Sequence, residues 1–168
     1  IDDNTPVITT GQTFSYSENQ LANAVVATVV ATDADTNNGA TATNFRFENS
    51  GGLPADTSSD GYFSINNNGD ISITAAGIAA GVAQNDFETS PNSFNYAIQA
   101  SSNGGTDFGA AVTVALNVTD IDDNTPVITP GQTFSYSENQ LADAVVATVA
   151  TTDADTNNGA TATNFRFE

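Results

Sequence analysis

The chain has 168 residues, of which 20 are acidic and two are basic, so its formal net charge at pH 7 is −18. Such a charge repels nucleic acid and anionic lipid headgroups, and we expect neither as a partner. The absence of cysteine and histidine excludes a disulfide framework and imidazole chemistry. No apolar run reaches the length of about 18 residues that spans a membrane, so we expect no insertion into a bilayer.

Short runs rich in β-branched and aromatic residues alternate with clusters of Asn, Gly, Asp and Pro along the whole chain. This pattern predicts an all-β protein, a two-sheet, immunoglobulin-like sandwich with Greek-key connections. The stretch Ala75–Ala83 can form either a short helical turn or a loop, and we expect a loop. The seven predicted strands of one repeat are Thr13–Ser17, Ala24–Thr32, Thr43–Glu48, Tyr62–Ile65, Asp70–Thr74, Phe94–Ala100 and Ala111–Val118.

The segment Ile1–Glu48 returns as Ile121–Glu168 with only four differences, at an offset of 120 residues. This offset predicts sandwich repeats of about 120 residues in tandem, because it is close to the common size of a domain. We expect residues 1–124 to form a complete repeat with a leading linker at 1–6. Residues 120–126 would be the linker between repeats. Residues 125–168 would be the first part of a second repeat, too short to close the same core without the rest of a repeat.

Eight carboxylates fall at strand ends or in the linker between the repeats. Sets of oxygen ligands suit a hard cation, above all Ca²⁺, whereas Zn²⁺ prefers histidine and cysteine. Asp86 and Glu88 alternate, so their side chains point the same way if that segment is extended. The simpler alternative is that these groups are solvated surface turns. The eight residues are Glu18, Asp86, Glu88, Asp120, Asp122, Asp123, Asp153 and Asp155.

Several motifs resemble those of cadherin repeats, in the order of that family and over the whole repeat. The linker Asp120–Pro126 (DIDDNTP) is similar to the cadherin motif D-x-N-D-N-x-P, and Asn85–Glu88 (NDFE) is similar to L-D-x-E. Asp153–Asp155 (DAD) matches the cadherin D-x-D motif, and Glu18 lies at the x-E-x position. The scarcity of basic residues, the absence of cysteine and the near-identical copies resemble the cadherin-like repeats of large bacterial RTX-type adhesins.

The resemblance implies two to three Ca²⁺ ions at each junction between repeats. Glu18, Asp86, Glu88 and Asp123 would hold two ions, with help from Asp120 and the Ile121 carbonyl, and Asp155 would bridge toward the next repeat. The third ion would be held by Asp122, the Asn124 carbonyl and Asp153, with Asn158 as a further carbonyl ligand. Asp122 replaces the family's Asn, and Ser102 stands where the family has an Asp ligand. The partial equivalent junction at the N-terminus comprises Asp2, Asp3, Asn4, Asp33, Asp35 and Asn38.

The function that the resemblance implies is a calcium-rigidified extender repeat of a long, secreted bacterial cell-surface adhesin, with neighbouring identical repeats and calcium as its partners. The alternative is an adhesive module that binds a like repeat or a glycan. An enzyme is a third class, because paired carboxylates can hydrolyse glycosides. Here the pairs lie in metal motifs and no nucleophile–base pair is present, so we expect no catalytic residues and no enzymatic activity.

Overall fold

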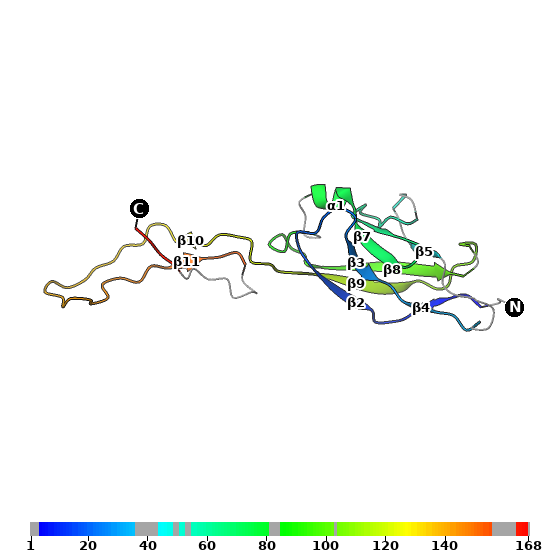
Figure 1. Ribbon diagram of the computed structural model, residues 1–168, viewed down its shortest axis with the longest axis horizontal. Coiled ribbons are helices and arrows are strands. Elements are labelled where there is room, and N and C mark those ends of the chain that lie inside the picture. Colours follow the sequence, from blue (N-terminus) through cyan, green and yellow to red (C-terminus); the bar gives the residue numbers. More distant parts are fainter. Residues whose placement is uncertain are drawn as a thin grey trace. The chain divides into compact units, whose positions relative to one another are not determined.

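The computed structural model describes residues 4–35, 44–48, 51–52, 55–80, 85–102, 104–155 and 164–167. The chain forms two compact units, Ile1–Thr119 and Asp120–Glu168. Figure 1 shows strands over the whole of the first unit and one short strand pair in the second. No helix among the described residues combines the length and the apolar character needed to cross a bilayer.

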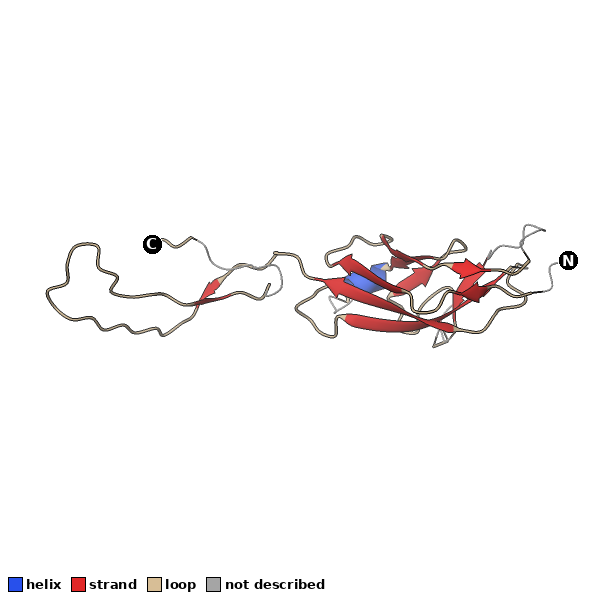
Figure 2. Cartoon of the chain, turned by 90° about the horizontal axis from the view of Figure 1, so that it is seen from below, coloured by secondary structure: helices blue, strands red, loops and turns tan. Residues whose placement is uncertain are grey.

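The first unit is a sandwich of a four-stranded and a three-stranded sheet (Figure 2). The larger sheet has the strand order β2-β9-β8-β5, the smaller has β3-β7-β6, and β1 pairs with β4. All pairs are antiparallel except β2 with β9. The strands are β1 (Val7–Ile8), β2 (Thr13–Ser17), β3 (Val25–Thr28), β4 (Ala31–Thr32), β5 (Asn44–Phe47), β6 (Phe63–Ile65), β7 (Asp70–Ile73), β8 (Ser93–Ser101) and β9 (Val112–Thr119).

Aromatic rings from both sheets meet in the core of the first unit. Phe63, on the smaller sheet, packs edge to face against Tyr16 and Tyr96 on the larger sheet, with ring centroids 6.3 Å and 5.5 Å apart. Phe47 packs against Tyr96 in the same way at 5.5 Å. Such T-shaped pairs add about 0.5–1.5 kcal/mol each to the burial of their area. The predicted all-β sandwich is therefore confirmed, with seven strands in its two sheets.

The predicted turn between β6 and β7 requires its glycine. Gly69 has a φ of +85°, and a Cβ atom there would lie 2.5 Å from the carbonyl oxygen of Val29. The Gly69 N–H donates to the Asn66 carbonyl at 3.0 Å, which closes the turn. Only a residue without a side chain satisfies both demands.

The prediction of a loop at Ala75–Ala83 was wrong for its first half, because Ala75–Ala79 forms a short helix, α1. Thr74 caps the helix, since its hydroxyl oxygen accepts a hydrogen bond from the Gly77 N–H at 3.1 Å. An N-cap threonine before alanines is enough to nucleate one turn once the flanking strand is fixed. Residues 81–84 lie outside the described residues.

The single strand predicted at Ala24–Thr32 is divided into β3 and β4, which pair with different strands. Between them, the Val30 N–H donates to the Gln12 side-chain oxygen at 2.8 Å, and the Gln12 amide donates back to the Val30 carbonyl at 3.0 Å. The Gln12 side chain therefore supplies the hydrogen bonds of the Val30 backbone at the point where the chain passes from β3 to β4. The β1 strand was not predicted, because two residues carry too little periodicity to identify a strand.

The second unit keeps only the counterpart of the β1–β4 pair. Its strands β10 (Val127–Ile128) and β11 (Thr151–Thr152) are antiparallel, with the register that β1 and β4 have 120 residues earlier. Among the described residues of this unit, no other stretch forms a strand. The strands β2, β3 and β5 of the first unit pair with β9, β7 and β8, which all belong to the later part of the repeat.

Candidate metal centre

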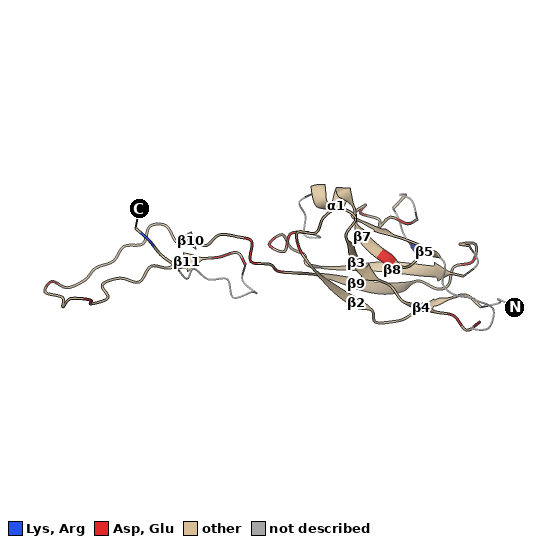
Figure 3. Ribbon diagram, viewed as in Figure 1, with Lys and Arg blue, Asp and Glu red and all other residues tan. Residues whose placement is uncertain are grey.

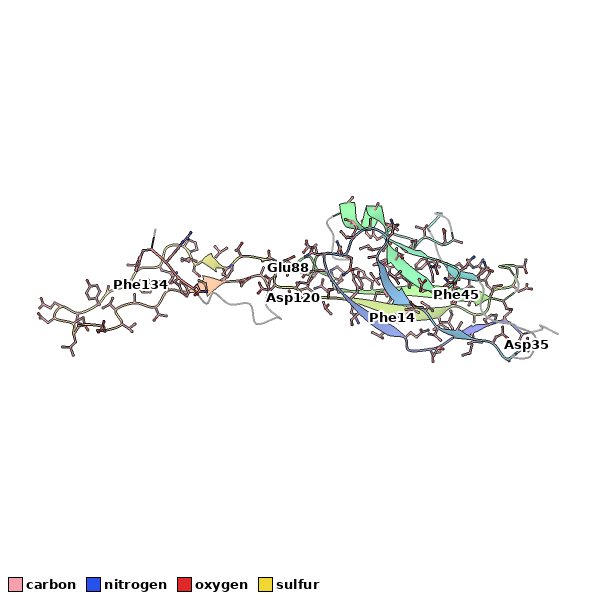
Figure 4. The ribbon with its side chains drawn as sticks, viewed as in Figure 1. Phe14, Asp35, Phe45, Glu88, Asp120 and Phe134 are labelled. Atoms are coloured by element: carbon pink, nitrogen blue, oxygen red, sulfur yellow. The ribbon has the colours of Figure 1, made fainter. Side chains whose placement is uncertain are left out.

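Acidic side chains of the first unit lie mainly in its loops and not on its sheets (Figure 3). Asp70 is the only acidic residue within strands β1 to β9 as the structure describes them. Figure 4 labels Asp35 and Glu88, which lie at opposite ends of this unit. Negative charge is therefore concentrated where the chain enters and leaves the sandwich.

Glu18 brings a carboxylate into a buried position at the end of β2. Its side chain is 1% exposed, and one of its oxygens accepts a hydrogen bond from the Phe87 N–H at 2.7 Å. Its own N–H donates to the Thr119 carbonyl at 3.1 Å, which ties it to the end of β9. Carboxylate oxygens of Glu18 and Glu88 lie within 4.8 Å of each other. Glu18 is buried and Glu88 is exposed. Two negative charges this close repel each other, and a cation between them would remove the repulsion.

The loop that carries Asp86 and Glu88 is clamped to the segment after β2 by Asn85. The Gln20 N–H donates to the Asn85 side-chain oxygen at 2.7 Å, and the Asn85 amide donates to the Gln20 carbonyl at 3.2 Å. From the other side, the Asn92 amide donates to the Phe87 carbonyl at 2.7 Å. Sequence reasoning missed this positioning role; the available signal was an asparagine directly before an acidic residue, since such side chains bond to nearby backbone.

Asp86 and Glu88 do not lie on an extended segment, so the alternation argument for them does not hold. The Thr89 N–H donates to the Asp86 carbonyl at 3.3 Å, and the Thr89 hydroxyl donates to the Asp86 carboxylate at 2.9 Å. These two bonds close a turn over residues 86–89. The turn, and not a strand face, presents the two carboxylates.

The D-x-D motif has the same hydrogen-bond pattern in both units. In the first unit, the Asp35 N–H donates to the Asp33 carboxylate at 2.9 Å. The Asn4 N–H and side-chain amide donate to the two Asp35 oxygens at 2.7 Å and 3.0 Å.

In the second unit, the equivalent bonds from Asp155 to Asp153 and from Asn124 to Asp155 measure 3.3 Å, 2.7 Å and 2.9 Å. The arrangement is therefore encoded locally, because it forms in the second unit without the later strands of a repeat.

One carboxylate oxygen of each D-x-D motif is buried without a hydrogen-bond donor. Within the described parts of the chain, the Oδ2 atoms of Asp33 and Asp153 are shut off from solvent and accept no hydrogen bond. A buried polar atom without a partner is rare in folded proteins and costs about 1–3 kcal/mol. Since the same atom is left over in both copies, the donor set fits a cation that these oxygens would coordinate.

The linker residues of the second unit add further oxygens beside the D-x-D motif. Carboxylate oxygens of Asp123 and Asp155 lie within 4.8 Å of each other, and Asp155 is fully buried. The Asn124 side-chain amide donates to Asp123 at 2.9 Å, so one asparagine holds both carboxylates. Asp122 and Ile121 are exposed, and Asp120 is half-buried at the start of this unit.

Four of the predicted ligands lie outside the described residues: Asp2, Asp3, Asn38 and Asn158. Ser102 directly follows β8, at the end of the unit opposite to the end of β9. It carries a hydroxyl where the cadherin pattern has a carboxylate, so this position supplies no charged ligand.

No protein-family model matches the sequence, and no curated protein matches it. Solved structures of cadherin extracellular domains do match. The chain is similar to the protocadherin gamma-B4 extracellular domain, with a TM-score of 0.60 and 24% identity over 92% of this chain and 24% of that chain. It is similar to mouse cadherin-23 EC22-24, with a TM-score of 0.55 and 27% identity over 92% of this chain and 45% of that chain.

The human desmocollin-1 ectodomain matches with a TM-score of 0.68 and 20% identity, over 94% of this chain and 28% of that chain. The chain spans less than half the length of each of these three proteins. Together with the two sheets and their strand order, these similarities show that the chain has a cadherin-like β-sandwich fold.

Proposed function

We propose that the chain binds Ca²⁺ at the junction between its repeats and is an extender of a long extracellular adhesin, of the type found on bacterial surfaces. The observation that carries this proposal is the buried, unpartnered oxygen of Asp33 and again of Asp153. A hard cation with six to eight oxygen ligands at about 2.3–2.6 Å suits such a donor set.

We propose that the ligands of the different ions come from different parts of the junction. Glu18, Asp86, Glu88 and Asp123 would serve two ions. Covalent geometry supports a role for Asp120, since a peptide bond joins it to Thr119, whose carbonyl accepts the Glu18 N–H. The Ile121 carbonyl would assist there. Asp155 would bridge to the second repeat, and a third ion would take Asp122, the Asn124 carbonyl, Asp153 and Asn158.

Calcium would act mechanically in this function. Like charges about 4 Å apart repel by about 1 kcal/mol even in bulk water, so the metal-free junction would bend. Ions that share ligands from the linker and from both repeats would hold the repeats as a stiff rod, and their binding energy would become part of the folding energy. Near-identical repeats fit this spacer role, because a spacer needs length and no distinctive binding surface. For the same reason we propose that the chain is not an enzyme.

Small-angle scattering of the 168-residue chain, with calcium and with excess chelator, tests the proposal. When calcium is added, we expect the maximum intramolecular distance to increase. We also expect the distribution of intramolecular distances to become narrower, because the repeats would be held in one arrangement. Calcium titration of the same protein by calorimetry should give two to three sites. Scattering profiles that coincide in the two buffers would contradict the extender function, and a calorimetric trace without binding would contradict the calcium site itself.

A further inference from the structure

Two segments of the first unit, distant in sequence, carry the ligands that this unit would give to the proposed calcium site. Glu18 lies on one segment, and Asp86 and Glu88 lie on the other, where Figure 4 labels Glu88. The Phe87 N–H donates to a Glu18 carboxylate oxygen at 2.7 Å, so the two segments are in direct contact. The geometry of these ligands therefore depends on how firmly the two segments are joined.

Negative charge on the two segments opposes their contact. Carboxylate oxygens of Glu18 and Glu88 lie within 4.8 Å of each other, and like charges at such distances repel. Arg46 is the only basic residue in the sequence of the first unit. It is used elsewhere, since it donates to the Gln99 side-chain oxygen at 2.8 Å and lies over the Phe108 ring. Before a metal binds, uncharged hydrogen bonds must therefore hold the two segments together.

The Asn85 side chain supplies hydrogen bonds of this kind. Its oxygen accepts the Gln20 N–H at 2.7 Å, and its amide donates to the Gln20 carbonyl at 3.2 Å. The side chain thus pairs with one residue as a neighbouring strand would, donor to acceptor and acceptor to donor. The Asn85 backbone adds only its carbonyl, which accepts the Asn19 N–H at 3.2 Å. Asn85 directly precedes Asp86, so these bonds fix the start of the turn at 86–89 to the segment that follows Glu18.

An uncharged amide suits this position better than a charged side chain does. Lysine or arginine at position 85 would also hold the segments together, but its positive charge would repel a cation at the adjacent carboxylates. Aspartate would accept the Gln20 N–H but would have no donor for the Gln20 carbonyl. Asparagine provides both bonds and leaves the negative charge of the ligands available to a metal ion.

We propose, on the basis of the calcium function above, that Asn85 is a positioning residue that sets the calcium affinity of the first unit. Its side chain holds the 86–89 turn against the segment after Glu18, so the carboxylates of the two segments are already together when calcium arrives. Groups that hold metal ligands in place without touching the metal are commonly worth about 10- to 100-fold in metal affinity.

Calcium calorimetry of the 168-residue chain and of its Asn85→Ala variant tests the proposal. We expect the variant to bind calcium about 10- to 100-fold more weakly. Thr74→Ala is the control for general destabilisation, because the Thr74 hydroxyl bonds to Gly61 and Gly77 and caps α1. At a temperature where the first unit stays folded, Thr74→Ala should keep the calcium affinity of the parent.

Hydrogen exchange in excess chelator gives a readout that does not involve calcium. In Asn85→Ala the Gln20 amide should exchange faster, because it loses its acceptor. The Phe87 amide should also exchange faster, because the turn is no longer held against Glu18. Unchanged exchange at Phe87 would mean that Asn85 does not position the turn.

Asn85→Asp separates the effect of position from that of charge. The added negative charge by itself would raise the affinity for a cation. The substitution also places a carboxylate oxygen against the Gln20 carbonyl, so the turn is released and we expect weaker binding. Asn23→Asp is the matched control, since it adds the same charge to the first unit and aspartate stands at the equivalent position 143. It should not weaken calcium binding.

A double-mutant cycle with Glu88→Gln shows whether Asn85 acts through the turn. If it does, Asn85→Ala costs less calcium affinity in the Glu88→Gln background than in the parent, because one of the ligands that it positions is already lost. Losses that simply multiply would contradict this route.

The outcomes distinguish this proposal from the calcium function on which it rests. A parent that binds no calcium would overturn both. A parent that binds calcium would leave only the role of Asn85 in question. That role is wrong if Asn85→Ala binds calcium as tightly as the parent, if Thr74→Ala loses as much affinity, or if Asn85→Asp binds more tightly.

Discussion

At the scale of single residues, Asp60 is a surface carboxylate with a structural role. It accepts hydrogen bonds from the Tyr96 hydroxyl at 2.7 Å, the Ser58 hydroxyl at 2.6 Å and the Tyr62 N–H at 3.0 Å. Ser58 is fully buried, and its hydroxyl accepts the Phe63 N–H at 2.9 Å. The Asp60 side chain thus holds two buried residues of the core, Ser58 and Tyr96, through their hydroxyl groups. Asp60 is therefore a poor neutral control for any substitution at the calcium site.

Asp60→Ala should lower the free energy of unfolding by about 1–3 kcal/mol, because it removes the carboxylate that accepts hydrogen bonds from the Tyr96 and Ser58 hydroxyls. Urea unfolding measures the change, and a double-mutant cycle with Tyr96→Phe apportions it. Asp56 is also exposed, and its carboxylate accepts a long hydrogen bond from the Thr57 hydroxyl at 3.3 Å. Asp56→Ala is therefore the control and should stay within about 0.5 kcal/mol of the parent. Equal destabilisation by both substitutions would refute the structural role of Asp60.

Asp123→Ala should weaken calcium binding at least tenfold, which is about 1.4 kcal/mol. The reason is the proposed position of Asp123 beside Asp155, where removal of one carboxylate leaves the ions with fewer oxygens and less charge. Isothermal calorimetry of the full chain measures the affinity. Asp143→Asn is the matched control, since it also removes one charge and reproduces the residue found at position 23. If Asp143→Asn weakens binding as much as Asp123→Ala does, the assignment of Asp123 is wrong.

Asp70 should make the first unit less stable in acid. Hydrogen bonds from the Asn66 amide at 2.9 Å and the Thr28 hydroxyl at 2.8 Å lower the pKa of Asp70 below its usual value. The ionised form is therefore favoured in the folded state. Its stabilisation is complete above the unfolded pKa of about 3.9 and is lost as the pH falls through the folded pKa.

The measurement is the urea midpoint of the parent and of Asp70→Asn between pH 2 and pH 7. We expect a constant advantage of the parent above about pH 5, which shrinks toward zero in stronger acid. A difference that does not depend on pH would show that the carboxylate charge is not involved.

At the scale of elements, the β6–β7 hairpin supports the rest of the sandwich through its close approach to Val29. The Val29 N–H donates to the Gly69 carbonyl at 2.8 Å, so the turn also closes the gap between β3 and β4. The same turn brings Phe45 within 3.2 Å of the position that a Cβ atom of residue 69 would occupy. A small change in the hairpin therefore reaches both sheets.

Gly69→Ala should destabilise the first unit by clearly more than about 1 kcal/mol, since it combines an unfavourable φ with a clash against backbone. Gly11→Ala is the control that separates the cost of the unfavourable φ from the cost of the clash. Gly11 also has a positive φ, +73°, but an added Cβ atom would meet nothing within 4 Å. Thermal unfolding of both variants measures the difference in stability. Equal losses of stability would mean that the unfavourable φ explains the whole effect and that the close approach to Val29 does not contribute.

At the scale of the whole molecule, removal of calcium should lower the melting temperature of the full chain. Ions that bind only the folded state stabilise it by about 4 kcal/mol per site at a free concentration 1,000 times the dissociation constant. Differential scanning calorimetry with calcium and with excess chelator measures the shift. Magnesium at the same concentration is the control and should give a smaller shift, because Mg²⁺ requires a smaller, regular octahedral site. An unchanged melting temperature in chelator would contradict the proposed calcium site.

The sequence alone determined the class of the fold, because alternation along each strand and glycine at the β6–β7 turn are local signals. Six of the seven strands of the two sheets lie within one residue of their predicted bounds, and β3 covers the first half of the strand predicted at Ala24–Thr32. The D-x-D arrangement is equally local, since Asp33–Asp35 and Asp153–Asp155 form it in two different surroundings. Spacing also identified the acidic residues around the linker as candidate ligands, and their roles stay predictions.

Only the tertiary structure decided features that depend on partners distant in sequence. The division of Ala24–Thr32 into two strands arises because β7 pairs with one half and β1 with the other. The structural role of Asp60 depends on the Tyr96 hydroxyl, and the clamp of Asn85 depends on Gln20; in both cases the partner lies far away in the sequence. The second unit gives the clearest case. Nearly the same 48 residues form β1 to β5 in the first unit, whereas the described residues of the second unit form only the counterparts of β1 and β4. In the first unit β2, β3 and β5 pair with strands from the later part of the repeat, and strand pairing needs such a second strand.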